Sequence, residues 1–139
     1  MMIRTVAVLI ALLLVASAAP AAPARYVIVD RSTETLMSAA TANAMWNELL
    51  TPTLVKLYPP GKWGFASEVE GGFNAAKTCV ITARAMLMPR RGKALLFTPA
   101  KTATAFDALP SATEAQCKEL ARLKLKEAMQ GVVASLSAR

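Results

Sequence analysis

The chain has 139 residues, a length at which one domain is expected, and its 55% hydrophobic content excludes a disordered polar chain. Lysine and arginine number 16 against 9 aspartates and glutamates, which gives a formal net charge of +7. Histidine is absent. Its absence removes the commonest general base, Ser-His and Cys-His nucleophile pairs, and most catalytic zinc sites.

Residues 1–24 are predicted to be a secretory signal peptide. Arg4 is their only charge, and the apolar run after it, residues 5–19, is shorter than the roughly 20 residues of a membrane-spanning helix. Ala-x-Ala occurs in three registers, so the mature chain starts between Ala19 and Arg25. An uncleaved membrane anchor is the alternative. We expect residues 25–139 to form a single small globular domain in the periplasm or the secreted space. Bacterial export is favoured by the alanine-rich cleavage region and by the lack of any Asn-x-Ser/Thr site.

Cys79 and Cys117 are predicted to form one disulfide bond, because an even number of cysteines in an exported chain favours pairing. Cys79 begins a run in which alternate residues are apolar, as in a half-buried strand. Cys117 starts an apolar stripe at helical spacing. Free buried thiols and a redox or nucleophilic pair are the alternatives. A redox or nucleophilic pair is disfavoured because the cysteines are not spaced as Cys-x-x-Cys and because no histidine is present to activate a thiol.

The N-terminal half of the domain is predicted to be a strand followed by two helices. Residues 26–30 are apolar and β-branched, as in a strand. A helix is expected over residues 34–50, which lack glycine and proline, with Ser32 or Thr33 as its cap. Thr51-Pro52 then opens a second short helix that ends before Pro59-Pro60-Gly61.

From residue 63 the apolar period changes to two, which predicts strands. We expect strands over residues 63–70, 77–88 and 93–98, joined by turns at residues 71–74 and 89–92. Residues 99–110 are expected to be a connection. A C-terminal helix then runs over residues 112–136, with Ser111 and Glu114 as its capping box.

The predicted order is β-α-α-β-β-β-α, an α+β fold. The simplest arrangement is a three-stranded antiparallel meander, to which the N-terminal strand is an optional addition. The sheet packs against the N-terminal helical segment and the C-terminal helix.

No catalytic motif emerges from the sequence. It contains no phosphate-binding loop, no dinucleotide fingerprint and no nucleophile elbow. Glu68 and Glu70 are the only close acidic pair on one strand face. They are expected to lie on a solvent-exposed face, and a catalytic or metal-binding pair is the alternative. We therefore expect no enzyme activity, no cofactor and no metal site.

Positive charge is concentrated in the central hairpin, because residues 71–106 contain no acidic residue. The candidate binding residues are Arg84, Arg90, Arg91, Lys93 and Lys101, and the first four of them are expected to form one basic ridge. The alternative is that these side chains are solvated and keep an exposed hairpin soluble. Met86 and Met88 are on the same strand face as Arg84. Their side chains are expected either to be exposed as part of a contact surface or to be buried under a helix. Trp63, Phe65 and Phe97 are expected in the core, with an exposed binding platform as the alternative.

These observations predict an exported, non-catalytic binding protein that grips an acidic protein through the basic hairpin, as an inhibitor or an immunity protein does. Docking on an anionic lipid or polymer of the cell envelope is a second hypothesis. A hydrolase that uses only carboxylates is a third. Nucleic acid is not expected as a partner, because export separates the protein from it. The partner's identity and the oligomeric state stay open.

Overall fold

The structure is a computed structural model that describes residues 25–138. The predicted signal peptide and its cleavage registers lie outside the described residues. The elements in chain order are β1 (Val27–Asp30), α1 (Ala39–Leu49), α2 (Pro52–Leu57), β2 (Trp63–Phe73), β3 (Cys79–Arg91), β4 (Ala94–Leu95), β5 (Lys101–Leu109) and α3 (Glu114–Ser137). None of the described helices is long and apolar enough to cross a membrane.

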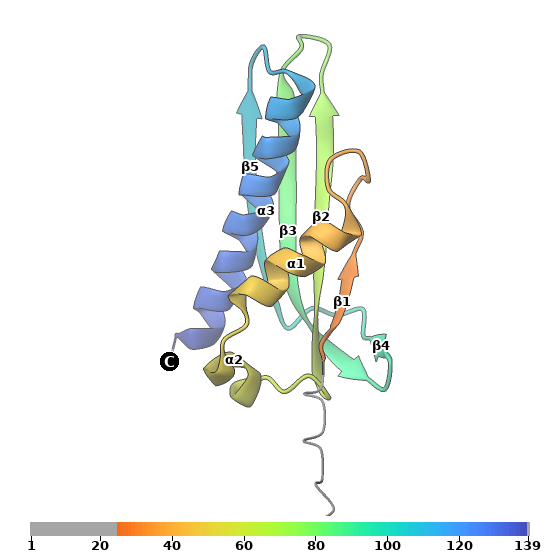
Figure 1. The fold of residues 1–139 in the computed structure, drawn as a ribbon, viewed down its shortest axis with the longest axis vertical. Helices are drawn as coiled ribbons and strands as arrows, with labels where there is room; N and C mark the ends of the chain where they lie inside the picture. Colours follow the sequence, from red (N-terminus) through yellow and green to blue (C-terminus); the bar gives the residue numbers. More distant parts are fainter. Residues whose placement is uncertain (1–24, 139) are drawn as a thin grey trace, which may run out of the picture.

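The sheet confirms the α+β class and the predicted order of elements, with one strand more. Strands β2, β3 and β5 form the antiparallel meander, and β1 adds to it in parallel beside β2 (Figure 1). The third long strand is β5, in the segment that the sequence predicted as a connection. The predicted strand over residues 93–98 shrinks to the two residues of β4, which pair only with the end of β3. The chain uses β4 to turn back and β5 to complete the sheet.

Helices α1 and α3 lie on the same face of the sheet and bury the core there (Figure 1). In β3 the inward positions alternate as predicted, from Cys79 to Leu87. In α3 the inward stripe runs from Cys117 to Leu136. Apolar residues recur every two positions in the strand and about every 3.6 positions in the helix. Each element therefore presents a continuous apolar surface to the other. Trp46 of α1 completes the core by stacking on Phe65 at a centroid distance of 4.5 Å.

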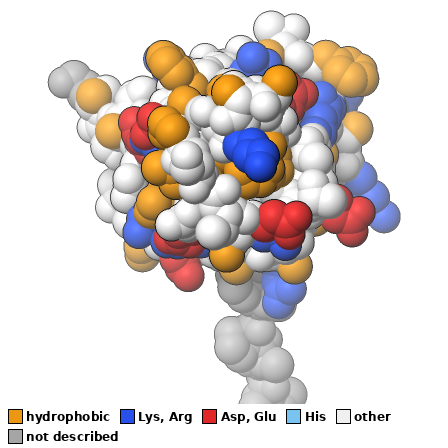
Figure 2. Space-filling model, turned by 90° about the horizontal axis from the view of Figure 1, so that it is seen from above, with side chains coloured by type: hydrophobic (Ala, Val, Ile, Leu, Met, Phe, Trp, Pro, Cys, Tyr) orange, Lys and Arg blue, Asp and Glu red, His pale blue; other side chains and the backbone are white. Residues whose placement is uncertain are grey.

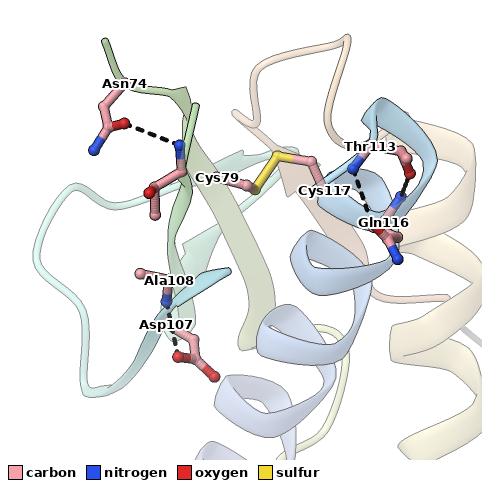
Figure 3. Close-up of a disulfide and its surroundings, with 8 residues drawn as sticks. Asn74, Cys79, Asp107, Ala108, Thr113, Gln116 and Cys117 are labelled. Atoms are coloured by element: carbon pink, nitrogen blue, oxygen red, sulfur yellow. Dashed lines mark hydrogen bonds between the residues drawn. A yellow bond between two sulfur atoms is a disulfide. The ribbon is translucent and has the colours of Figure 1, made fainter. Parts of the chain in front are cut away.

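The disulfide is confirmed: Cys79 at the start of β3 is bonded to Cys117 in the first turns of α3, with their Cα atoms 5.6 Å apart (Figure 3). Both residues are buried. The bond therefore fastens the N-terminal end of the long helix to the central strand, inside the core.

Helix caps differ from the prediction at two of three places. Thr51-Pro52 starts α2 as expected. Helix α1 is capped by Ser38, because Ser32 accepts from Val69 N–H and so serves the β1–β2 junction. In α3 the capping box is Thr113 with Gln116, two residues later than predicted (Figure 3). The predicted cap, Ser111, has a φ of 55° and belongs to the turn before the helix.

The predicted turn at residues 71–74 is also shifted. Strand β2 continues through Phe73, and Gly71 sits so close to β3 that any side chain there would overlap the carbonyl of Val80. The turn follows, and its Asn74 side chain accepts from the backbone N–H of Ala76 and Thr78 at 3.0 Å. Gly71 thus allows the close pairing of β2 with β3, and Asn74 makes the turn.

The face of the sheet away from the helices, called the open face below, carries the outward residues of β2, β3 and β5. In register across it lie Glu68, Arg84 and Thr104, and next to them Glu70, Thr82 and Phe106. At one end, Met86 and Met88 are buried under Leu95 of β4. No helix takes part in this small cluster, and the rest of the open face faces solvent.

Candidate binding surface

One end of the molecule is formed by residues 59–64 and 87–101, which contain five basic residues and no acidic one. These are Lys62, Arg90, Arg91, Lys93 and Lys101. They belong together because Lys62 O accepts from Arg90 N–H at 2.8 Å and Lys101 pairs in register with Leu87. We call this region the basic end. Four of the five, Lys62, Arg91, Lys93 and Lys101, are exposed, and Arg90 is half-buried.

Arg90 holds this end together rather than projecting from it. Its Nε donates to the carbonyl of Gly92 at 2.5 Å, and its Nη1 donates to the carbonyls of Pro60 at 2.6 Å and Arg25 at 3.4 Å. The planar guanidinium suits this task because its donors are fixed in a fork. Arg90 therefore positions the hairpin tip that carries Arg91 and Lys93.

Arg84 lies apart from the other candidates. It is six residues from Arg90 along an extended strand, which is about 20 Å at the usual rise. It sits in the middle of the open face, half exposed, with its Nη1 3.6 Å from a carboxylate oxygen of Glu68. The structure thus brings four of the five predicted binding residues to one end and places the fifth beside an acidic neighbour.

Two exposed apolar side chains also belong to the basic end. Phe97 is 89% exposed and Leu96 is 38% exposed. The expectation that Phe97 is a core residue is wrong, whereas Phe65 is fully buried and Trp63 packs against the core. The apolar residue that turns inward from this loop is Leu95, whose side chain rests against the bare Cα of Gly64. The exposure of Phe97 fits the alternative expectation for this residue, an aromatic side chain at the surface.

The opposite end of the molecule has no comparable excess of one charge. Viewed from above, basic and acidic side chains are interspersed on it (Figure 2). A cleft of about 280 Å³ beside the disulfide is lined by Glu114 and Lys118, one residue of each sign, with Phe73 and neighbouring residues. Positive charge is therefore a property of the basic end.

The acidic pair Glu68 and Glu70 occupies the open face as predicted, with both side chains on the same side of β2. Glu68 is the ion-pair partner of Arg84. No group of three or more His, Cys, Asp or Glu side chains within residues 25–138 is arranged to hold a metal ion. The two carboxylates thus lack the opposed arrangement that glycoside hydrolysis requires.

Shifted pKa values occur at Tyr26, next to the basic end, and on the surface of α3. Burial raises the pKa of Tyr26 above its ordinary value of 10.0, and its hydroxyl donates to the carbonyl of Tyr58. On the surface of α3, the hydrogen bond from Arg122 lowers the pKa of Glu119. Neither side chain is one of the candidate binding residues.

Comparisons with known proteins name no family. No family model and no curated protein matches the chain. Among solved structures, a dodecamer of a PelC variant from Paraburkholderia phytofirmans is similar over 86% of this chain and 94% of that one, with 13% sequence identity and a TM-score of 0.42. A likeness of that degree gives no guide to what this chain does.

Proposed function

We propose that the protein is an exported, non-catalytic binding protein whose basic end grips an acidic protein surface, in the manner of an inhibitor or an immunity protein. The observation that carries the proposal is the collection of five basic residues, without an acid, on a rigid end of the domain. Export is supported by the signal-like residues 1–24 and by a buried disulfide, a bond that persists in oxidising compartments.

Rigidity is what makes this end suitable for recognition. The hairpin tip is held at its base by the three hydrogen bonds of Arg90 and by Leu95 seated on Gly64. Arg91 and Lys93 are therefore presented without the ordering cost that a free loop pays on binding. Long-range attraction from the basic end also raises the rate of encounter with an acidic partner.

The test is capture of a partner from the envelope fraction of the native host with immobilised protein. Arg91→Glu combined with Lys93→Glu reverses the charge of the tip and leaves Arg90 in place. The matched control, Lys118→Glu with Lys126→Glu, makes the same change of net charge on exposed positions of α3. We expect one acidic protein to be captured by the wild type and the control, and lost with the tip variant. Equal capture by all three would refute a role for the basic end.

A second function, docking on anionic lipid, is favoured by Phe97. An exposed aromatic ring surrounded by basic residues is typical of surfaces that lie at a membrane interface. Co-sedimentation with phosphatidylglycerol vesicles across a salt series measures this. Lipid docking predicts that Phe97→Ala weakens vesicle binding and that added salt abolishes it. If the wild type does not bind vesicles and Phe97→Ala abolishes capture of the acidic protein, the ring contacts the protein partner instead.

A further inference from the structure

Strand β5 forms a long bare edge of the sheet. It pairs with β3 along all nine residues from Lys101 to Leu109, and no strand within residues 25–138 pairs with its other side. Strand β1, at the opposite edge, has only four residues. A long exposed edge is a template for another strand, and proteins usually shorten, charge or cover such edges.

The backbone groups that β5 turns outward follow from the ladder. Arg90 N–H donates to Lys62 O in the β2–β3 register, so even-numbered residues of β3 bond to β2 and odd-numbered residues bond to β5. By the same alternation, the even-numbered residues of β5 point their N–H and C=O groups away from β3. These residues are Thr102, Thr104, Phe106 and Ala108.

One of these four residues already has its N–H hydrogen-bonded within the chain. The N–H of Ala108 donates to the carboxylate of Asp107 at 2.8 Å (Figure 3). That bond agrees with the outward direction of the Ala108 N–H and blocks further pairing there. The edge is therefore open over Thr102, Thr104 and Phe106, and Thr104 is its centre.

We propose that β5 pairs antiparallel with β5 of a second copy of this chain, about a two-fold axis at Thr104. This register uses the three open residues of each copy and leaves the Asp107–Ala108 bond intact. It also sets Lys101 of each copy directly opposite Asp107 of the other. Moving the axis to Ala105 would instead place Lys101 opposite Leu109, so only the Thr104 register matches charge to charge.

The side chains of the edge agree with this pairing. Lys101 is exposed. The Asp107 side chain is 54% exposed and lies 3.7 Å from Lys124 Nζ, so its carboxylate has room for a second cation. On the open face, Phe106 is 76% exposed. Its ring comes to lie beside Thr102 of the second copy, and Thr104 meets its own counterpart. Aromatic and threonine pairs of this kind stabilise neighbouring strands.

The self-complementary charge pattern favours a second copy over a foreign strand. The paired molecules share one continuous sheet, with the helices of both copies on the same side of it. Lys101 is shared with the basic end, but the backbone bonds and the Phe106 contact involve no other residue of that end, so this inference does not depend on the proposed function.

Crosslinking tests the register. Opposite residues in a hydrogen-bonded antiparallel pair have Cα atoms about 5.5 Å apart, within the range of a disulfide. Thr104→Cys is therefore expected to give a covalent homodimer on mild oxidation, seen on a non-reducing gel. The matched control is Thr82→Cys on the same open face, which stays monomeric because Thr82 lies in β3, flanked by β2 and β5. Crosslinking of neither variant, or of both equally, overturns the proposal.

Sedimentation equilibrium tests the association itself. The wild type is expected to reach the mass of a dimer as its concentration rises. Lys101→Glu, which sets like charges against each other, should raise the dissociation constant about tenfold. Thr104→Pro should abolish the dimer, because it removes the N–H donor at the centre of the edge. The domain itself should still fold, because this N–H is not used by β3 and proline is tolerated at such a position. A monomeric wild type, or a dimer that neither substitution weakens, refutes β5 pairing.

Discussion

Breaking the Cys79–Cys117 bond should cost the domain a large part of its stability. The cysteines are 38 positions apart, so the bond closes a loop of about 39 residues. In the chain-entropy model, closing a loop of that size stabilises the folded state by about 4 kcal/mol at 25 °C. A domain of this size has a total stability of about 5–15 kcal/mol, so the reduced protein should stay folded only narrowly.

The assay is urea unfolding of the oxidised protein, the reduced protein and the Cys79→Ala, Cys117→Ala double variant. We expect the last two to lose about 4 kcal/mol, or roughly 15 °C in melting temperature. The double variant should lose slightly more than the reduced protein, because both sulfur atoms are buried and their removal leaves a gap. The slope of free energy against urea should also rise in both, since an unlinked chain exposes more surface on unfolding.

A loss below about 1 kcal/mol in both samples would refute the reasoning, because it would mean that the unfolded chain is little constrained by the bond. An unchanged slope combined with a large loss would point to lost packing in the folded state instead. Agreement between the reduced protein and the double variant excludes an effect of the reductant itself.

Further predictions concern single residues. Leu125→Ala removes a fully buried side chain from the α3 stripe and should lower the free energy of unfolding by about 2–5 kcal/mol in urea. Thr113→Ala should cost about 1 kcal/mol in the same assay, through loss of the α3 cap. Gly71→Ala should prevent folding, as judged by circular dichroism, whereas Gly72→Ala, which also has positive φ but meets no atom, should fold with reduced stability. Because the pKa of Tyr26 is raised on folding, its contribution is present below pH 10 and falls as the pH rises through the folded-state pKa. Alkaline melting curves of wild type and Tyr26→Phe should therefore converge above about pH 10.

The parts of the fold that the sequence predicted are those in which large apolar residues recur regularly. Alternation from Cys79 to Leu87 fixed the inward face of β3, and the stripe from Cys117 to Leu136 fixed that of α3. Because these patterns place both cysteines on inward faces, they also supported the prediction of the disulfide. These patterns are informative because burying large side chains dominates folding.

Strand β5 was missed because its inward side chains are small. Ala103 and Ala105 bury little surface on their own, so the strand carries no strong apolar signal. They are inward because α3 lies close above them, where a side chain at Gly131 would already crowd Ala103. The alternation of Thr102, Thr104 and Phe106 was the signal that favoured a strand.

The candidate surface was predicted only as a charge pattern. Sequence reasoning had no means of placing the carbonyls of Arg25 and Pro60 beside Arg90, since both are remote along the chain. It also could not show that Leu95, and not Phe97, turns inward, because a strand of two residues has no readable period. Long-range contacts of this kind decide which charged side chains are free to meet a partner.

Gly64 makes such a contact possible by having no side chain at all. Leu95 sits in the space that a methyl group at this position would fill, and that space is bounded on its other side by the backbone of Val27. A gain of one carbon atom at the start of β2 would thus push the neighbouring loop outward and re-aim Arg91 and Lys93. The direction in which the domain displays its positive charge is thus set by a hydrogen atom on β2, the strand next to the one that ends in Arg91.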